Sequence, residues 1–169
     1  MHHPTYEEKL TSRRTTALFV VLTILFLALA IWRWMAVGWD FLSVVFLCLS
    51  ALFLFYVINY WMLVIRVTET DLVLKFGILS WKLPLEELGV CRLDDAPAWV
   101  RYGGAGIHFA LVRSQYRAFF NFLEYDRLLI DFKKKRGMVE ALVFSTKQPE
   151  TIMGILDSVR QETHTTPSL

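Results

Sequence analysis

The stretch Thr15–Trp34, TTALFVVLTILFLALAIWRW, decides the architecture of this chain, because it is apolar on every side of a helix. A second run, Phe41–Ile65 (FLSVVFLCLSALFLFYVINYWMLVI), follows after a short connection that contains Gly38. Each run is about as long as the roughly 20 residues that a helix needs to cross a hydrocarbon core. We therefore expect a tight antiparallel hairpin of two transmembrane helices over 15–65. A buried core helix is the alternative, and the all-round apolarity of two adjacent runs disfavours it.

The composition of the whole chain agrees with this hairpin. Hydrophobic residues make up 55% of the 169 residues and aromatic residues 15%. The mean hydropathy of +0.42 is too high for a simple soluble domain. The first run is not expected to be a secretory signal, because no small-residue cleavage pattern follows it and Trp32, Trp34 and Trp39 occupy that region. These tryptophans suit a membrane–water interface.

Basic residues predict the orientation of the hairpin. Lys9, Arg13 and Arg14 precede the first run and Arg66 follows the second, whereas only Arg33 lies near the connection. By the positive-inside rule, both termini are expected on the cytoplasmic side. We interpret Arg33 as an interfacial side chain that extends towards water rather than as a functional charge within the membrane.

The cysteines argue against a disulfide-bonded protein, and the net charge argues against a nucleic-acid-binding protein. Cys48 lies within the second apolar run and Cys91 lies well beyond it, so no disulfide is expected, as suits a reducing compartment. The net charge of +2 is too small to indicate nucleic acid as a partner.

After residue 66 the apolar residues alternate. In the stretch DLVLKF, Leu72, Leu74 and Phe76 share one face, as in a half-buried strand. Gly77 and Gly137 lie in turns between such stretches. Strands are expected at about 63–68, 71–76, 79–84, 89–94, 107–112, 115–122, 127–132 and 138–144.

The chain then changes to a helical pattern. Pro149 suits a first helical position, and an apolar stripe follows at helical spacing, which predicts a helix over 149–161. Many short strands and one closing helix predict a small antiparallel barrel or sandwich. The expected parts are a cytoplasmic N-terminal segment (1–14), the hairpin (15–65), a cytoplasmic domain (66–162) and a flexible tail (163–169).

Four motifs occur in order within this domain. They are Phe76-Gly77, the Pro-led turn from Pro84 to Leu88, the stretch GGAGI at 103–107 and Pro149-Glu150. Together they resemble the bacterial pleckstrin-homology-like (PH-like) domain, over about residues 66–160. The resemblance implies an α+β protein, in which a PH-like antiparallel β-barrel closed by a C-terminal α-helix follows two transmembrane helices. It also implies the bacterial inner (cytoplasmic) membrane as the location. His108 departs from the family, which often has Arg there.

The glycines of VRYGGAGIHF, residues 100–109, raise the question of a nucleotide site. A dinucleotide fingerprint needs G-x-G-x-x-G between a strand and a helix, and no glycine follows Gly106 at the required distance. We therefore expect Gly103, Gly104 and Gly106, together with Gly77 and Pro149, to have structural roles.

Patterns for catalysis are missing from the sequence. No His, Cys or carboxylate pair has a metal-ligand spacing, and no serine has a glycine-flanked elbow. The adjacent acids Glu86-Glu87 and Asp94-Asp95 are interpreted as solvated turns. We expect neither an enzyme nor a cofactor or metal ion.

Two stretches suggest binding surfaces. The stretch KKKR is interpreted first as a solvated hairpin tip. The second interpretation is a contact for anionic lipid, which contributes about 1 kcal/mol per basic residue near the surface. The four residues of this stretch are Lys133, Lys134, Lys135 and Arg136. The second stretch is a candidate surface for a protein partner. It consists of Trp99, Arg101 and Tyr102, which precede Gly103. Phe119 and Phe122 are further candidates, although strand alternation points them in opposite directions. The alternative for these phenylalanines is a strand covered on both faces, by the core and by the closing helix or the membrane surface. The alternative for Trp99 and Tyr102 is contact with the head-group layer.

The sequence thus favours a membrane-anchored, non-enzymatic interaction module. We expect membrane lipids and a membrane-embedded protein as its partners. One alternative is an accessory or assembly subunit of a larger membrane complex, for instance a photosynthetic one. Another is a module that senses anionic lipid. The sequence determines neither the identity of the partner nor the oligomeric state.

Overall fold

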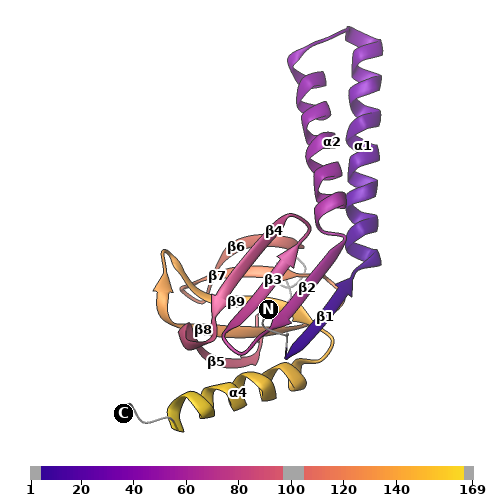
Figure 1. The fold of residues 1–169 in the computed structure, drawn as a ribbon. Coiled ribbons are helices and arrows are strands. Elements are labelled where there is room, and N and C mark those ends of the chain that lie inside the picture. The colour runs from indigo at the N-terminus through magenta and orange to yellow at the C-terminus, as the bar shows by residue number, and fades with distance from the viewer. Residues whose placement is uncertain (1–4, 97–104, 166–169) are drawn as a thin grey trace.

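In the computed structural model a long helical hairpin stands on a β-sandwich (Figure 1). The structure describes residues 5–96 and 105–165, except for the side chains after residue 158. The hairpin consists of α1 (Arg13–Val37) and α2 (Phe41–Asn59), both long and apolar enough to cross a membrane. Helix α1 extends beyond the expected span at both ends. Helix α2 ends earlier than expected, at Asn59, because the residues after 61 form a strand.

The two helices pack through aromatic rings and close through a polar tip. The rings of Phe26 and Phe53 stack with centroids 5.5 Å apart. At the tip, Asp40 caps α2 by accepting a hydrogen bond from the backbone N–H of Ser43 at 2.9 Å. Arg33 Nη2 lies 2.7 Å from Asp40 Oδ2, so the only basic residue near the connection holds the cap in place.

The remaining chain forms two sheets. The four-stranded sheet has the order β1-β2-β3-β4 and is antiparallel throughout. The five-stranded sheet has the order β5-β8-β9-β7-β6. The strands of the first sheet are β1 (Tyr6–Thr11), β2 (Met62–Val67), β3 (Asp71–Phe76) and β4 (Leu79–Pro84). Those of the second are β5 (Leu88–Leu93), β6 (Gly106–Val112), β7 (Gln115–Asn121), β8 (Asp126–Arg136) and β9 (Val139–Thr146).

The eight strands expected from alternation are all present, and each begins within one residue of its expected start. The expected closed, all-antiparallel barrel is wrong. The described strands form two separate sheets whose strands cross one another (Figure 1). In addition, β7 pairs with β9 in parallel, because the β8–β9 hairpin inserts between β5 and β7. The coarser expectation of an α+β chain with two long apolar helices is confirmed.

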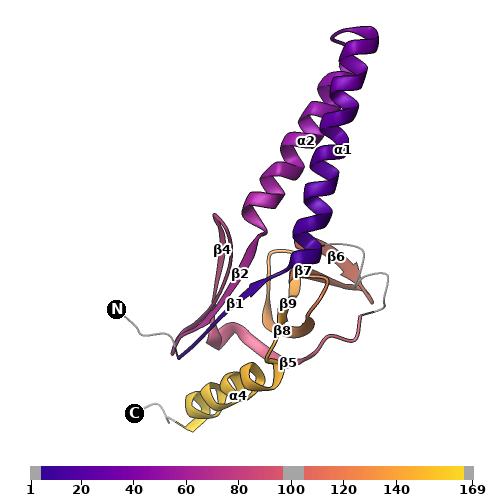
Figure 2. The same ribbon diagram turned by 90° about the vertical axis from the view of Figure 1, so that its right-hand side faces the viewer.

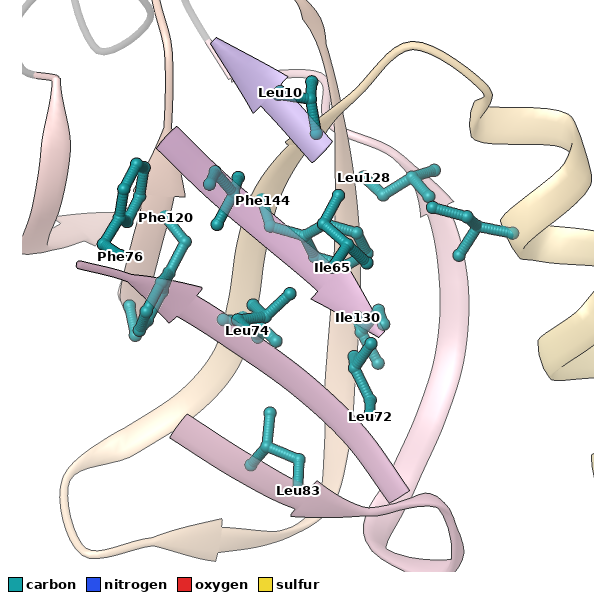
Figure 3. Close-up of a cluster of buried hydrophobic side chains, with 14 of the residues drawn as sticks. Leu10, Ile65, Leu72, Leu74, Phe76, Leu83, Phe120, Leu128, Ile130 and Phe144 are labelled. Carbon is teal, nitrogen blue, oxygen red and sulfur yellow. The ribbon is translucent and has the colours of Figure 1, made fainter. Parts of the chain in front are cut away.

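One apolar core fills the space between the sheets (Figure 3). Alternate residues of each strand point into it, as the pleat of a strand requires. Ile65 and Leu74 come from the four-stranded sheet, and Phe120, Ile130 and Phe144 come from the five-stranded sheet. The short helix η1 (Leu85–Glu87) follows β4, as the Pro-led turn predicted.

Helix α4 (Pro149–Thr165) begins at the expected proline and covers the end of the sandwich away from the hairpin (Figures 1 and 2). Ile152 is fully buried in the core, and Met153, Ile155 and Leu156 pack against it. The helix contacts η1, β5 and β8. The apolar stripe read from the sequence is therefore the face that closes the sandwich.

Strand β1 was not expected. It precedes α1, and it pairs with β2, the strand that follows α2. The segment 1–14 thus includes part of the domain, and a fragment that starts at residue 66 would lack β1 and most of β2. The domain is built around the hairpin rather than after it.

Candidate functional site

The junction between the hairpin and the domain has no linker. Only Ser12 separates β1 from α1, and only Tyr60 and Trp61 separate α2 from β2. The two flanking strands are neighbours, with Leu10 opposite Leu63. Ser12 also caps α1, because its Oγ accepts a hydrogen bond from the backbone N–H of Thr15 at 3.0 Å. Both chain passages into the hairpin therefore start from hydrogen-bonded strands.

Two glycines let the domain approach the end of α2. Gly106 has φ +84°, and a Cβ placed there would lie 2.5 Å from Cε2 of Tyr60. Gly77 has φ +52°, and a Cβ there would lie 2.7 Å from Oδ1 of Asn59. That conformation and that space both require glycine, so Gly77 and Gly106 shape the contact between the domain and the residues at the end of α2. Gly103 and Gly104 lie outside the described residues.

The start of α1 is tied to the domain by hydrogen bonds. The Tyr125 hydroxyl donates to the carbonyl oxygen of Thr11 at 2.6 Å. The backbone N–H of Arg14 donates to Glu124 Oε1 at 2.7 Å. Both partners lie in the connection between β7 and β8, so the five-stranded sheet and its connections contact the start of α1 and also Tyr60, the residue that follows α2.

A buried carboxylate holds β1 in place. Glu8 is only 9% exposed, and its Oε2 accepts hydrogen bonds from Thr146 Oγ1 at 2.6 Å and from the Tyr6 hydroxyl at 3.1 Å. Its Oε1 accepts from the backbone N–H of Lys147 at 2.9 Å. Burial and the neighbouring Glu8 raise the pKa of Tyr6 to about 12. The carboxylate thus links the first strand to the end of the last one.

The outer face of the four-stranded sheet is charged, and Figure 1 shows no helix over it. Its central residues are Val64 and Val73, which lie opposite Lys75 and Lys82. Ion pairs join neighbouring strands at 2.9 Å (Arg66–Glu7) and 3.0 Å (Lys82–Asp71). Lys75 forms no ion pair with a described residue. Four basic and two acidic residues give this outer face an excess of two positive charges: Lys9, Arg66, Lys75, Lys82, Glu7 and Asp71.

The face of the five-stranded sheet that points away from the core carries a buried ion cluster. Asp94 Oδ1 lies 3.2 Å from Arg117 Nη1, and Asp94 Oδ2 lies 2.7 Å from Arg127 Nη2. The three side chains are at most 4% exposed. The interpretation of Asp94 as part of a solvated turn is therefore wrong, whereas Asp95 is exposed and pairs with Arg113. A buried carboxylate between two guanidinium groups ties the segment after β5 to the sheet.

Two of the expected partner contacts are buried. Phe119 is 0% and Phe122 is 1% exposed, so neither offers a surface, and that prediction is wrong. They point in opposite directions, as alternation predicted. Phe122 joins the main core, and Phe119 joins a second cluster, where the His108 ring stacks on it with centroids 4.8 Å apart. Burial and the nearby Arg127 lower the pKa of His108. Trp99, Arg101 and Tyr102 lie outside the described residues.

The basic stretch is a strand and not a turn. Lys133–Arg136 form the end of β8, and the turn begins only at Gly137. The interpretation of these four residues as the hairpin tip is therefore wrong. Lys135 pairs with Glu140, and Arg136 Nε lies 3.4 Å from Glu87 Oε2 in η1. These acids offset part of the positive charge. Contact of the stretch with anionic lipid remains a prediction.

No protein-family model matches this chain, and neither a curated protein nor a solved structure is significantly similar to it. The PH-like resemblance therefore remains a prediction.

Sequence patterns missed two parts of this arrangement. The stretch YEEKLT contains few of the residues that favour strands, and only the alternation of Tyr6, Glu8 and Leu10 hints at its pairing. The Asp94 cluster joins three segments far apart in the sequence, and no local spacing announces it.

Proposed function

We propose that this protein is a membrane-anchored, non-enzymatic interaction module. In this proposal the hairpin spans the bacterial inner membrane with both termini in the cytoplasm, and a PH-like domain lies at the cytoplasmic surface. The observation that carries the proposal is the pairing of β1 with β2 across the two ends of the hairpin. A domain joined to its anchor by two paired strands keeps one orientation relative to the membrane.

A fixed orientation matters for binding at a membrane. Confinement to two dimensions raises the effective concentration of the domain for a membrane-embedded partner, provided that the geometry permits contact. A flexible linker would let the domain sample many directions, most of them unproductive. The contacts of Gly106 with Tyr60 and of Tyr125 with Thr11 oppose such motion.

The outer face of the four-stranded sheet is the proposed contact for a protein partner. Its excess of positive charge suits an acidic surface, and complementary charge speeds encounter and fixes register. Its ion pairs are exposed, and such pairs contribute little to stability, so a partner can replace them at small cost. Lys75 is available to a partner without breaking an ion pair to any described residue.

The PH-like assignment has partial support. A sandwich of two crossing sheets with a C-terminal helix over one end agrees with it, and the parallel β7–β9 pair departs from the all-antiparallel expectation. We base the proposed function on the anchor and the outer face, which do not depend on that assignment.

Partner capture from native membranes tests the proposal. The full-length protein is compared with a Lys75→Glu/Lys82→Glu variant, which reverses the charge of the outer face. A Lys133→Glu/Lys134→Glu variant makes the same change of charge on β8 and serves as the matched control. We expect the first variant to lose a specific protein that the control retains, with both still resistant to extraction from the membrane. The same set of captured proteins in all three samples would contradict the proposal. A partner held in a fixed stoichiometry would favour an accessory subunit of a larger complex.

A further inference from the structure

Exposed apolar side chains surround the base of the hairpin. Ile78 is 76% exposed in the β3–β4 turn, and Leu111 is 63% and Phe109 53% exposed on β6. Trp61, after α2, and Leu79, at the start of β4, are exposed as well. We call these five residues the apolar rim. Large apolar side chains gathered at one side of a domain indicate a surface that something covers.

The rim lies on the side of the domain that faces the hairpin. The backbone N–H of Ile78 donates to Asn59 Oδ1 at 3.3 Å, and Asn59 is the last residue of α2. Strand β6 begins at Gly106, which touches Tyr60. Figure 1 shows β6 at the edge of its sheet towards the hairpin, and β5, at the other edge, lies near α4 in both views (Figures 1 and 2).

The length of α2 places this side of the domain relative to a bilayer. A helix of 19 residues is about 28 Å long at about 1.5 Å per residue. That length nearly equals the hydrocarbon thickness of about 30 Å, beyond which each head-group layer adds about 5–7 Å. If α2 spans the hydrocarbon, Asn59 lies at its boundary. Groups in direct contact with Asn59 and Tyr60 then lie in the head-group layer.

We propose that the apolar rim is immersed in the head-group layer of the same membrane that the hairpin crosses. The lipid surface is thus a direct partner of the domain, which is seated on the bilayer as well as tethered to it. This inference rests on the proposed membrane anchoring. It assigns the contact with lipid to β6, the β3–β4 turn and Trp61 rather than to the basic end of β8.

The polarity around Trp61 supports lipid as the occupant. Trp61 lines a cavity of about 490 Å³ beside the start of α1, and the other lining residues are Thr11, Ser12, Arg13, Thr16, Ala17 and Val20. Its lining changes from polar residues and Arg13 to the apolar Ala17 and Val20 along the chain, in the order in which a phospholipid changes from phosphate to acyl chain. Arg13 forms no ion pair or side-chain hydrogen bond with a described residue, so its guanidinium is available to a phosphate.

The rim also continues the exposed apolar surface of the hairpin. Ile58 in α2 is exposed, and Trp61 follows it by three residues. Trp is favoured at the depth where hydrocarbon meets head groups. A lipid surface therefore covers the hairpin and the rim without a gap, whereas a protein occupant would have to displace lipid from the rim alone.

Site-specific fluorescence quenching tests the inference on the full-length protein in vesicles of phosphatidylcholine and phosphatidylglycerol. Two variants lack both native cysteines through Cys48→Ala and Cys91→Ala. Each contains one new cysteine, introduced by Phe109→Cys in the first variant and by Leu93→Cys in the second. Leu93 lies on the opposite edge strand and is 55% exposed, close to the 53% of Phe109, so it is the matched control. A third variant, Cys91→Ala alone, keeps Cys48 within α2 as the reference for insertion. Each cysteine carries an environment-sensitive fluorophore.

The expected result is distinct for each position. Lipids with a nitroxide near the head group should quench the label at 109 several-fold more than the label at 93, and aqueous iodide should do the reverse. Lipids with a nitroxide in the acyl chain should quench the label at Cys48. If acyl-chain nitroxide quenches the label at Cys48 while iodide quenches the label at 109, the inference is overturned and the proposed membrane anchoring still stands. A label at 109 that neither iodide nor lipid quenches would also overturn it, because a protein, such as a second copy paired with β6, would cover the rim. Failure to quench at Cys48 would overturn both the anchor and the inference.

Discussion

Replacing Gly106 by Ala should destabilise the docking of the hairpin on the domain. Gly106 adopts φ +84°, where an L-residue is strained by about 1–3 kcal/mol. The new Cβ would lie 2.5 Å from Tyr60 Cε2 and 2.6 Å from Cδ2. These distances are about 1 Å shorter than an ordinary carbon–carbon contact. Either the ring or the strand must move.

The two costs add to a measurable effect. Overpacking of a filled site costs about 1–3 kcal/mol, so the sum of the two terms is about 2–6 kcal/mol. For a chain of this size each kcal/mol lowers Tm by about 2–4 °C. We therefore expect a decrease in Tm on the order of 10 °C.

Thermal unfolding of the full-length protein in nanodiscs measures this effect. Gly137→Ala is the matched control, because Gly137 also has a positive φ of +63° but no atom within 4 Å of its added Cβ. The difference between the two variants isolates the contact with Tyr60. A double variant, Gly106→Ala with Tyr60→Leu, should be less destabilised than the sum of the single changes. If Gly106→Ala were no more destabilising than Gly137→Ala, the close docking of Tyr60 on β6 would be refuted.

Three further predictions concern the N-terminal strand, acid stability and orientation. Glu8→Ala removes the acceptor of three hydrogen bonds, from the buried Thr146 hydroxyl, the Tyr6 hydroxyl and the Lys147 N–H, and should cost about 2–4 kcal/mol of stability. Glu7→Ala, on the exposed face of the same strand, should change Tm little, and equal effects in thermal unfolding would contradict the role of Glu8 in holding β1. Because the folded-state pKa of His108 is lowered from 6.5, the unfolded chain takes up the proton first, so stability should be complete above about pH 7 and fall as the pH drops towards 5. A His108→Gln variant should have a flatter pH profile, and an unchanged profile would assign the acid sensitivity to other groups. Reporter fusions at residue 169 and within 36–39 should report opposite sides of the membrane, with residue 169 cytoplasmic; a periplasmic signal from residue 169 would reverse the proposed topology.

The helices and strands of this protein can be predicted from the sequence because the hydrophobic patterns that specify them involve residues close together in the chain. A run such as Thr15–Trp34 has no polar face and can only be a helix exposed to an apolar medium or buried on all sides. In β3, alternation specifies both the strand and its buried face. Pro149 and the stripe after it specify where α4 begins and which side it buries. These features depend on neighbours within a few residues.

The candidate site depends on contacts between distant segments. The polar strand β1 is stable because β2 offers it hydrogen bonds and because Thr146 and Lys147 donate to Glu8. The sequence left open whether Phe119 and Phe122 are exposed or lie on a strand covered on both faces, and only their contacts in two separate clusters decide that both are buried. Asp94 has the sequence context of a turn residue, and only the folded structure shows that it is buried between Arg117 and Arg127.

The sequence by itself determined the two apolar helices, the eight strands after them and the closing helix, because hydrophobic periodicity records which side of each element avoids water. Only the tertiary structure decided that β1 and β2 pair at the two ends of the hairpin, that the sheets form a sandwich with a parallel β7–β9 pair, and that Gly106 admits the ring of Tyr60. Strand pairing and close packing join residues far apart in the chain, and their free energy depends on complementary shapes that no local pattern encodes.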